Sequence, residues 1–284
     1  MVLVLTTRGL ALTDAQRERV ENCADLATLT GSEGIGRLGN NAFRLIDAKP
    51  HPDLAAYCDA HQLDFAFVPE DRHLNNFRLF VTDMDSTLIS IECIDEIADM
   101  QGLKTEVATI TEAAMRGELD FRESLTRRVA LLEGLPEQAL AQVFKERLRL
   151  NPGAETLMAG LKQAGLLTVL VSGGFTYFTE RLQKQLGFDY AVANQLEIRK
   201  GKLTGRVKGE VIDGEAKRHT LRLVCEHHGF PRESVIAAGD GANDLPMLAE
   251  AGIGIAYHAK PVVRKQATHA ISHAGLDGIL KLFA

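Results

Sequence analysis

Three short apolar runs, each ending in polar residues, constrain the fold of this chain more than any other feature. FRLFVTD, LLTVLVSGG and VIAAGDG lie at residues 77–83, 166–174 and 235–241, and a helical stretch follows each of them. Short runs that are apolar throughout are typical of strands buried on both faces of a parallel sheet. The sequence therefore predicts an α/β fold, with a Rossmann-like parallel sheet in a core of residues 77–284.

A long helical segment separates the first apolar run from the second. Residues 90–151 contain the helical patterns IDEIADMQGL, TEVATITEAAMRGEL and FRESLTRRVALLEGL, and no pattern typical of a strand. We therefore expect about 90–151 to form a helical cap, inserted after the first core strand and lying over the sheet edge. A hairpin over 194–207 and a helix beginning near Lys217 are expected to follow.

The first 76 residues have a different pattern. Strand-like and helical stretches alternate, with Thr13 and Asp14 as candidate caps of a helix that ends near Leu29. This order predicts a small N-terminal α+β domain over 1–76, which weakly resembles ACT-like modules. The segment 34–39 matches GxGxxG, but it follows a helix instead of a strand, so we expect a loop and no dinucleotide site.

Charge and cysteine content narrow the classes of partner. The formal net charge is −6, which argues against nucleic acid or an anionic membrane as a partner. No apolar run approaches the roughly 18 residues of a membrane span, and the start of the chain is a poor match to a signal peptide. The four cysteines are far apart and form no CxxC pair, which favours free thiols in a reducing compartment. We expect a cytoplasmic protein, and the sequence leaves its oligomeric state open.

The first run ends in two carboxylates, in the sequence Asp83-Met84-Asp85-Ser86-Thr87. Ligands of open α/β sheets bind beyond the carboxyl ends of the strands. Two carboxylates at such an edge can act as a nucleophile and as an acid/base. Taken alone, they are explained equally well as caps of the following turn and helix.

A second acidic motif follows the third run. Asp240 lies in GDGAND, and Asp244 falls in the first turn of the next helix, where the helix dipole alone favours a negative charge. If the two motifs meet, carboxylates about 4 Å apart repel by about 4 kcal/mol at an effective dielectric near 20. Such a cluster favours a hard cation, and oxygen ligands favour Mg²⁺. The two motifs together predict a Mg²⁺ site.

Two further features suit a phosphoryl group. The hydroxyl of Ser172 and the amides of Gly173 and Gly174 can hold an anion at the start of a helix. Lys217 supplies a positive charge. Alone, SGG is typical of a turn and a helix lysine is usually solvated. Beside a carboxylate–Mg²⁺ site, they provide the charge balance that a phosphate needs.

These four motifs, in this order, resemble those of the haloacid dehalogenase-like phosphatase superfamily. DMDST is similar to its DxDx[ST] motif, VS to its Ser/Thr motif, Lys217 to its lysine and GDGAND to its second acidic motif. The resemblance covers about 77–284. Within the superfamily the chain is most similar to the phosphoserine phosphatases, whose cap pattern continues through 90–96.

The resemblance implies Mg²⁺-dependent hydrolysis of O-phospho-L-serine to L-serine and phosphate, the last step of serine biosynthesis in that family. Asp83 would attack the phosphorus and form an aspartyl-phosphate, and Asp85 would be the proton donor and then the base. Mg²⁺ would be held by the Asp83 carboxylate, the Asp85 backbone carbonyl and Asp240, with Asp244 supporting the metal site.

The resemblance also implies the substrate contacts. Those of the core fall on Ser172, Gly173, Lys217 and Asn243. In the cap, Glu92 would bind the ammonium and Arg128 the carboxylate, with Met115 and Phe121 as possible lid contacts. By residue type alone, Glu92 is explained as a charge at a helix start and Arg128 as part of a solvated face. Core packing likewise explains Met115 and Phe121.

Other functions fit part of this pattern. A related capped phosphatase or phosphotransferase would use the same motifs on another small phosphomonoester or acceptor. A phospho-accepting signalling domain also combines a strand-end aspartate, Mg²⁺, a hydroxyl residue and a lysine, but it has no use for a base at Asp85. Alternatively, residues 1–76 would make the chain an amino-acid sensor, which serine binding by that segment would support.

Overall fold

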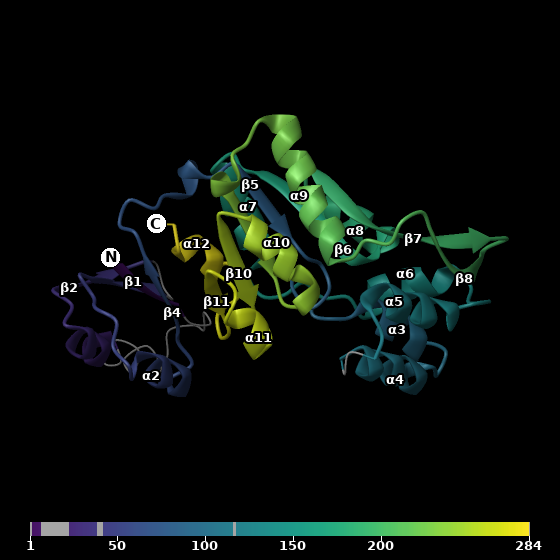
Figure 1. Cartoon of the computed structure of the whole chain (residues 1–284), viewed down its shortest axis with the longest axis horizontal. Helices are drawn as coiled ribbons and strands as arrows, with labels where there is room; N and C mark the ends of the chain where they lie inside the picture. The colour runs from purple at the N-terminus through teal and green to yellow at the C-terminus, as the bar shows by residue number, and fades with distance from the viewer. Residues whose placement is uncertain (1, 7–22, 39–41, 116–117, 284) are drawn as a thin grey trace.

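Two β-sheets organise the computed structural model, which describes residues 2–6, 23–38, 42–115 and 118–283 (Figure 1). The smaller sheet has the strand order β2-β3-β1-β4, and the larger has the order β11-β10-β9-β5-β6-β7-β8. In the larger sheet every pairing is parallel except that of β7 with β8. The predicted α/β fold with a mostly parallel core sheet is confirmed.

The larger sheet contains the three strands that the apolar runs predict and four more. Its strands are β5 (Leu79–Thr82), β6 (Leu167–Phe175), β7 (Tyr190–Arg199), β8 (Lys202–Lys208), β9 (Val235–Gly239), β10 (Ile253–Tyr257) and β11 (His269–Ile271). The predicted hairpin is β7–β8, but β7 begins earlier and its first residues pair with β6. The sequence patterns did not predict this extension or the strands β10 and β11.

Helices cover both faces of the larger sheet (Figure 1). Side chains alternate between its faces, so that Leu79 and Val81 of β5 join one buried cluster while Phe80 joins the other. Leu79 and Val81 pack with α9 (Gly214–His228), α10 (Leu245–Glu250) and α11 (Pro261–Arg264). Phe80 lies in the cluster of α7 (Ala154–Gln163), α8 (Thr176–Leu186) and α12 (Gly278–Lys281).

In the segment for which a cap is expected, the described residues between β5 and α7 form four helices. They are α3 (Cys93–Asp99), α4 (Lys104–Met115), α5 (Phe121–Ala130) and α6 (Gln138–Glu146). They gather at one end of the larger sheet, near the β7–β8 hairpin (Figure 1). Asp120 fixes the start of α5, because its side chain accepts a hydrogen bond from the Glu123 N–H at 2.8 Å.

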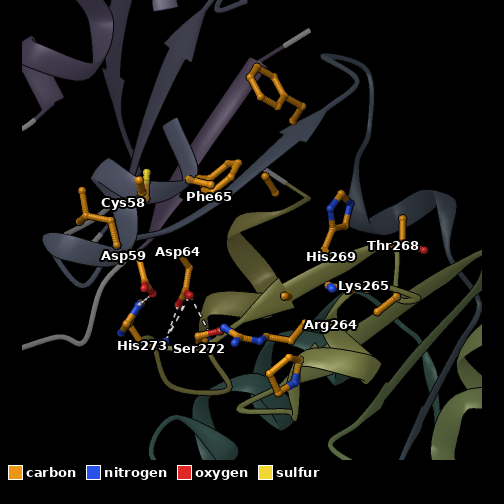
Figure 2. Close-up of a pocket in the computed structure, with 18 residues that line it drawn as sticks. Cys58, Asp59, Asp64, Phe65, Arg264, Lys265, Thr268, His269, Ser272 and His273 are labelled. Carbon is orange, nitrogen blue, oxygen red and sulfur yellow. Dashed lines mark hydrogen bonds and ion pairs between the residues drawn. The ribbon is translucent and has the colours of Figure 1, made fainter. Parts of the chain in front are cut away.

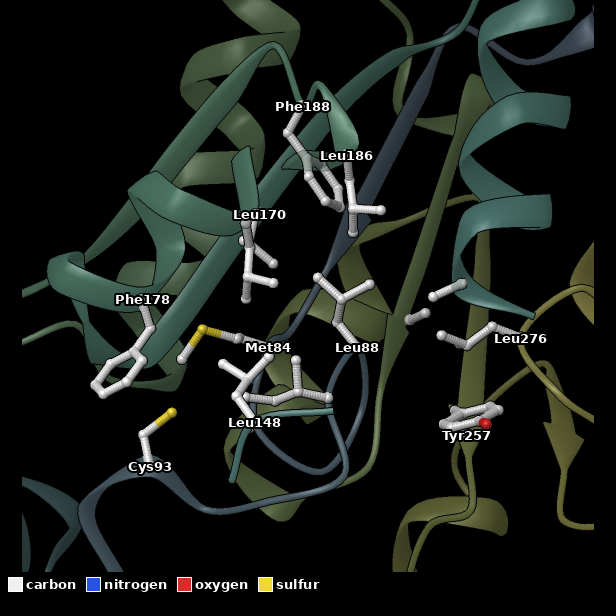
Figure 3. Packing of buried hydrophobic residues seen from close by; sticks show 14 of the residues in the cluster. Met84, Leu88, Cys93, Leu148, Leu170, Phe178, Leu186, Phe188, Tyr257 and Leu276 are labelled. Atoms are coloured by element: carbon white, nitrogen blue, oxygen red, sulfur yellow. The ribbon is translucent and has the colours of Figure 1, made fainter. Parts of the chain in front are cut away.

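Buried side chains join these helices to the core. Met84 and Leu88 of the loop after β5 pack in the same cluster as Cys93 at the start of α3 and Leu148 after α6 (Figure 3). Phe178 of α8 faces the same group of side chains (Figure 3). The two chain segments that enter and leave the helical insertion are therefore both anchored in the main core.

The smaller sheet belongs to an N-terminal α+β unit. Its elements are β1 (Val2–Thr6), a helix over 23–30, β2 (Gly34–Arg37), β3 (Ala42–Ile46), α2 (Leu54–Ala60) and β4 (Asp64–Val68). This strand–helix–strand–strand–helix–strand order is that of ferredoxin-like folds. It agrees with the predicted α+β architecture, while the likeness to ACT modules stays a prediction. The proposed caps Thr13 and Asp14 lie outside the described residues.

The prediction of a loop over 34–39 is wrong for the first four residues. Gly34–Arg37 form strand β2, which pairs antiparallel with β3. Two glycines in four residues hide the strand pattern, because glycine has a low strand propensity. Backbone pairing with β3 nevertheless holds Gly34–Arg37 extended.

The two units meet along β4 and β11, beside a cavity of about 780 Å³ (Figure 2). The carboxylate of Asp64, at the start of β4, accepts hydrogen bonds of 2.6–3.2 Å from the backbone N–H groups of Ser272, His273 and Ala274. Asp64 is only 7% exposed. A residue of the N-terminal unit therefore accepts the hydrogen bonds of three backbone N–H groups of the core.

Replacing Asp64 by Asn is expected to destabilise the protein by about 1.5–3 kcal/mol, the usual contribution of hydrogen bonds to a charged group. The amide group offers one acceptor oxygen in place of two, and its own N–H₂ opposes the backbone donors. Chemical denaturation would measure the loss. Asp59→Asn is the matched control, because Asp59 faces His273 at 3.4 Å but is 78% exposed. Equal stability of the two variants would contradict the assigned role of Asp64.

No helix in the described part of the chain is both long enough and apolar enough to cross a lipid bilayer.

Candidate active site

The loop after β5 brings Asp83 and Asp85 to the carboxyl edge of the sheet. The Asp83 N–H donates to the Ala238 carbonyl of β9 at 3.0 Å, which continues the strand pairing by one residue. Ser86 then adopts a left-handed conformation with φ of 56°, where the chain turns. Asp83 is almost fully buried, and Asp85 is half-buried.

Lys217 lies between two carboxylates beneath this edge. Its Nζ is 2.7 Å from Asp83 Oδ1 and 2.7 Å from Asp244 Oδ1, and its side chain has no exposed surface. Asp213 fixes the start of α9 by accepting from the Ala216 N–H, which places Lys217 in the first turn. Burial alone would lower the pKa of Lys217, but Asp244 and Asp83 outweigh burial and raise it. Lys217 is therefore a permanent buried cation.

Asp240 and Asp244 complete an acidic cluster with Asp83. Ligand atoms of the three carboxylates lie within 4.8 Å of one another. Burial and the charge of Asp244 raise the pKa of Asp83 well above its ordinary value, and the same two causes raise the pKa of Asp240 to about 6. The ionised forms are thus disfavoured as the cluster stands, and a further positive charge would stabilise them.

The donor set fits a hard divalent cation. All of the clustered ligands are carboxylate oxygens, which are the ligands that such cations prefer, and Lys217 contacts only one oxygen of Asp83. Both oxygens of Asp244 are engaged, one by Lys217 and the other by the N–H groups of Asp240 and Gly241 at 3.1 and 2.9 Å. Asp83 and Asp240 are therefore better able than Asp244 to offer a carboxylate oxygen to a metal ion.

The end of β6 forms a polar cradle beside these carboxylates. The Gly174 N–H donates to Ser172 Oγ at 2.8 Å, and Ser172 Oγ lies 3.4 Å from Asp85 Oδ2. A Cβ at Gly174 would overlap Asp85 Oδ2, and one at Gly173 would lie 2.8 Å from the ring of Phe121. The absence of a side chain at Gly173 thus allows the cap residue Phe121 to approach the core, and the absence of one at Gly174 leaves room for Asp85.

The cap contributes to the orientation of Asp85. The Cys93 N–H, at the start of α3, donates to Asp85 Oδ1 at 3.0 Å. Burial raises the pKa of Asp85, and its hydrogen bonds from Cys93 oppose that rise. A carboxyl group with a raised pKa is suited to donating and then accepting a proton.

Glu92 and Arg128 face the same cavity from the cap side. The Ser86 hydroxyl donates to Glu92 Oε1 at 2.7 Å. The residue Glu92 keeps exposed surface at the mouth of the cavity, yet the surrounding protein, followed by the charge of Asp85, raises its pKa to about 8. Burial lowers the pKa of Arg128, opposed chiefly by Asp95 and Glu92. One acidic and one cationic group thus border a single space, and a bound cation would favour the ionised form of Glu92.

A cavity of about 130 Å³ unites nearly all of the predicted residues. It is lined by Asp83, Asp85, Glu92, Ile94, Phe121, Leu125, Arg128, Ser172, Gly173, Gly174, Phe175, Asp240 and Asn243. Lys217 and Asp244 lie beneath its floor, through their contacts with Asp83 and Asp240. Met115 ends α4, and its side chain lies outside the described part of the structure. The volume suits a small metabolite better than a drug-sized ligand.

Several supporting residues were missed by the sequence analysis. Thr87 Oγ1 donates to Asp240 Oδ1 at 2.9 Å, and buried Asn194 donates to the Gly173 carbonyl at 2.7 Å while accepting from the Ile212 N–H at 2.8 Å. Thr87 lies inside the DMDST motif, so its position was a usable signal. Asn194 lies on β7, where nothing in the local sequence indicates a contact with β6.

Comparisons with known proteins identify the family of the chain. The family model of haloacid dehalogenase-like hydrolases matches residues 80–249. A phosphoserine phosphatase of Polaromonas sp. is 55% identical over 217 residues, which cover 75% of this chain and 92% of the relative.

Solved structures give the same result. The crystal structure of a probable phosphoserine phosphatase from Vibrio cholerae, in unliganded form, matches with a TM-score of 0.83 and 41% identity, over 99% of this chain and 85% of that one. A structure described as a phospho-aspartyl intermediate analogue of phosphoserine phosphatase matches with a TM-score of 0.69 and 41% identity, over 73% of this chain and 99% of that one. The chain therefore belongs to the haloacid dehalogenase-like hydrolases and, within them, to the phosphoserine phosphatase family.

Proposed function

We propose that this chain hydrolyses O-phospho-L-serine to L-serine and phosphate, with Mg²⁺ as cofactor, as the last step of serine biosynthesis. The observation that carries the proposal is the single cavity in which the Asp83 cluster faces both Glu92 and Arg128. Phosphoserine combines a phosphate, an ammonium and a carboxylate, and the cavity offers a complementary group for each. The names of the relatives support the same substrate.

The chemistry follows from the two carboxylates after β5. An Asp83 oxygen attacks the phosphorus, the bond from phosphorus to the serine oxygen breaks, and Asp85 gives its proton to that oxygen. Asp85 then takes a proton from the water that hydrolyses the aspartyl-phosphate. The analogue structure of a relative supports such an intermediate. Asp85 accepts hydrogen bonds from Cys93 and Ser172, so its carboxyl group is held in place for both steps.

The remaining residues of the core bind the phosphate group and the metal ion. The Ser172 hydroxyl, the Gly173 amide and Lys217 hold phosphate oxygens, and Asn243 positions the substrate. The Asp83 carboxylate, the Asp85 carbonyl and Asp240 would hold Mg²⁺, and Asp244 supports them through Lys217 and the backbone of Asp240. When bound, the cation supplies charge neutralisation between the nucleophile and the phosphate dianion.

Substrate selection belongs to the cap. Glu92 binds the ammonium and Arg128 the carboxylate, while Phe121 closes the cavity over Gly173. We also propose that the chain divides into an N-terminal ACT-like domain of 1–76 and a catalytic domain of 77–284, with the cap at about 90–151.

Phosphate release from O-phospho-L-serine tests the proposal directly. Wild-type protein is assayed with Mg²⁺ and with EDTA, beside a panel of other phosphomonoesters. Preference for phosphoserine that disappears in EDTA is the expected result. Turnover of other esters, with phosphoserine ignored, would contradict the substrate assignment. Stable phosphorylation of the protein without release would favour a signalling role instead.

Replacing Glu92 by Gln is expected to raise KM for phosphoserine by about 10–100-fold, because a charge-assisted contact with the ammonium contributes about 1.5–3 kcal/mol. KM for phosphoglycolate, which has the carboxylate but lacks the ammonium, should change little. Steady-state kinetics on both substrates checks this. Glu96→Gln is the matched control, because Glu96 lies four residues further along, in α3, and pairs with Arg147. An equal rise for both substrates would contradict the role of Glu92.

Mg²⁺ is expected to raise the melting temperature more at pH 8 than at pH 5. The pKa of Asp240 is about 6 in the metal-free fold, against 3.8 ordinarily, so folding takes up a proton between about pH 4 and 6. The stability that Asp240 contributes therefore falls as pH rises through that window. Metal binding needs the ionised carboxylate and reverses the loss, by about 2.7 kcal/mol at 100 times Kd.

Thermal unfolding across this pH range, with Mg²⁺ and with EDTA, measures the difference. Asp240→Asn should abolish most of it. A difference that is constant with pH, or that persists in the Asn variant, would exclude Asp240 as a ligand.

A further inference from the structure

An ion pair links the start of α5 to the loop that precedes α9. Arg122 Nε lies 2.6 Å from Asp213 Oδ2, and the two side chains are 56% and 17% exposed. Arg122 belongs to the helical segment between β5 and β6, whereas Asp213 follows the β7–β8 hairpin in the core. The pair therefore joins the cap to the core close to the catalytic cavity.

Asp213 is held firmly on the core side. Its Oδ1 accepts from the Ala216 N–H at 2.9 Å, and its carbonyl accepts from the Lys217 N–H at 2.9 Å. Its other carboxylate oxygen accepts from Arg122. One side chain thus connects the first turn of the helix that carries Lys217 to the first turn of the cap helix α5.

The helix α5 supplies much of the cap side of the cavity. Phe121, Leu125 and Arg128 line it, at a spacing that places all of them on one face of the helix. The ring of Phe121 lies directly over Gly173. Any rotation or shift of α5 therefore changes the distance between Arg128 and the phosphate cradle at Ser172.

We propose that Arg122 and Asp213 are positioning residues, which hold α5 against the start of α9 and so place Phe121 and Arg128 for substrate binding. The inference rests on the proposed function in that it takes Arg128 as the carboxylate ligand. The pair is partly exposed and open to screening by salt, which limits the expected effect to about two- to fivefold.

Substitutions that remove the charges without disturbing the helices test the pair. Arg122→Gln keeps a long polar side chain, and Asp213→Asn keeps a good N-cap for α9. Each is expected to raise KM for phosphoserine about two- to fivefold with kcat nearly unchanged, and Arg122→Lys should restore part of the affinity. The double variant should be no worse than either single variant, because both break the same interaction.

Arg127→Gln is the matched control. Arg127 lies on the same helix, is also 56% exposed, and pairs at 2.6 Å with Glu123 inside α5, so its loss should leave KM unchanged. An equal rise in KM for Arg127→Gln, or additive effects in the double variant, would overturn the proposal.

Calorimetric titration with inorganic phosphate and Mg²⁺ separates this inference from the substrate assignment. Arg122→Gln is expected to weaken phosphate binding by a similar factor, because phosphate occupies the cradle that Phe121 covers. Equal phosphate affinity of this variant and the wild type would overturn the positioning role, whether or not phosphoserine is hydrolysed. Failure of the wild type to hydrolyse phosphoserine would overturn only the proposed function.

Discussion

Replacing Asp83 by Asn is expected to lower kcat for phosphoserine by about 10⁴–10⁶-fold, as loss of a catalytic nucleophile does in other enzymes. The amide cannot form the bond to phosphorus, and the neighbouring carboxylates of Asp85 and Asp244 are held by other contacts. Asp85 is turned toward Cys93 and Ser172, and Asp244 is engaged by Lys217 and the backbone. Phosphate release, and trapping of the phosphorylated protein in acid, would measure both the rate and the intermediate.

The Asn variant should remain folded, which makes the loss interpretable. Burial and Asp244 already raise the pKa of Asp83, and a neutral amide of the same shape removes the repulsion from Asp244. Lys217 loses its ion pair with Asp83 but keeps the one with Asp244 at 2.7 Å, so its charge stays compensated. Asp53→Asn is the control, because Asp53 is exposed at the start of α2, far from the cavity along the chain. Near-normal turnover by Asp83→Asn would exclude Asp83 as the nucleophile.

The residues whose placement follows most directly from the sequence lie at or just after the carboxyl ends of buried strands. Asp83, Ser172 and Asp240 each come directly after an apolar run, and parallel strands bring their carboxyl ends to one edge. Their meeting in one cavity therefore follows from strand order alone. The helix patterns of 90–151 were equally clear, because helical periodicity is a local property.

What the sequence left open depends on contacts between distant segments. The cavity contacts of Glu92 and Arg128 arise from how the cap helices pack, and neither residue differs in type from an ordinary surface charge. Asn194 donates a hydrogen bond to Gly173 of β6, which lies twenty-one residues earlier in the chain. β2 was hidden by its glycines, and only pairing with β3 reveals it. Such features require the tertiary structure.

Replacing Lys217 by Met is expected to destabilise the protein by about 3–5 kcal/mol, because removing one partner of a buried ion pair leaves uncompensated charge. Asp83 and Asp244 would then face each other without the cation that lies 2.7 Å from each. We also expect kcat to fall by about 10²–10³-fold, the usual effect of losing one oxyanion contact. Lys184→Met, at an exposed position of α8, is the control.

A double variant separates the two roles of Lys217. Adding Asp244→Asn to Lys217→Met removes one of the two stranded charges, so it should restore part of the stability measured by chemical denaturation. It should restore none of the turnover, because the phosphate still lacks the ammonium group of Lys217. Since the carboxylates hold the pKa of Lys217 above its ordinary value, Lys217 itself stays charged between pH 6 and 9 in the wild-type protein. Recovery of activity together with stability would show that Lys217 serves the fold alone and does not contact the phosphate.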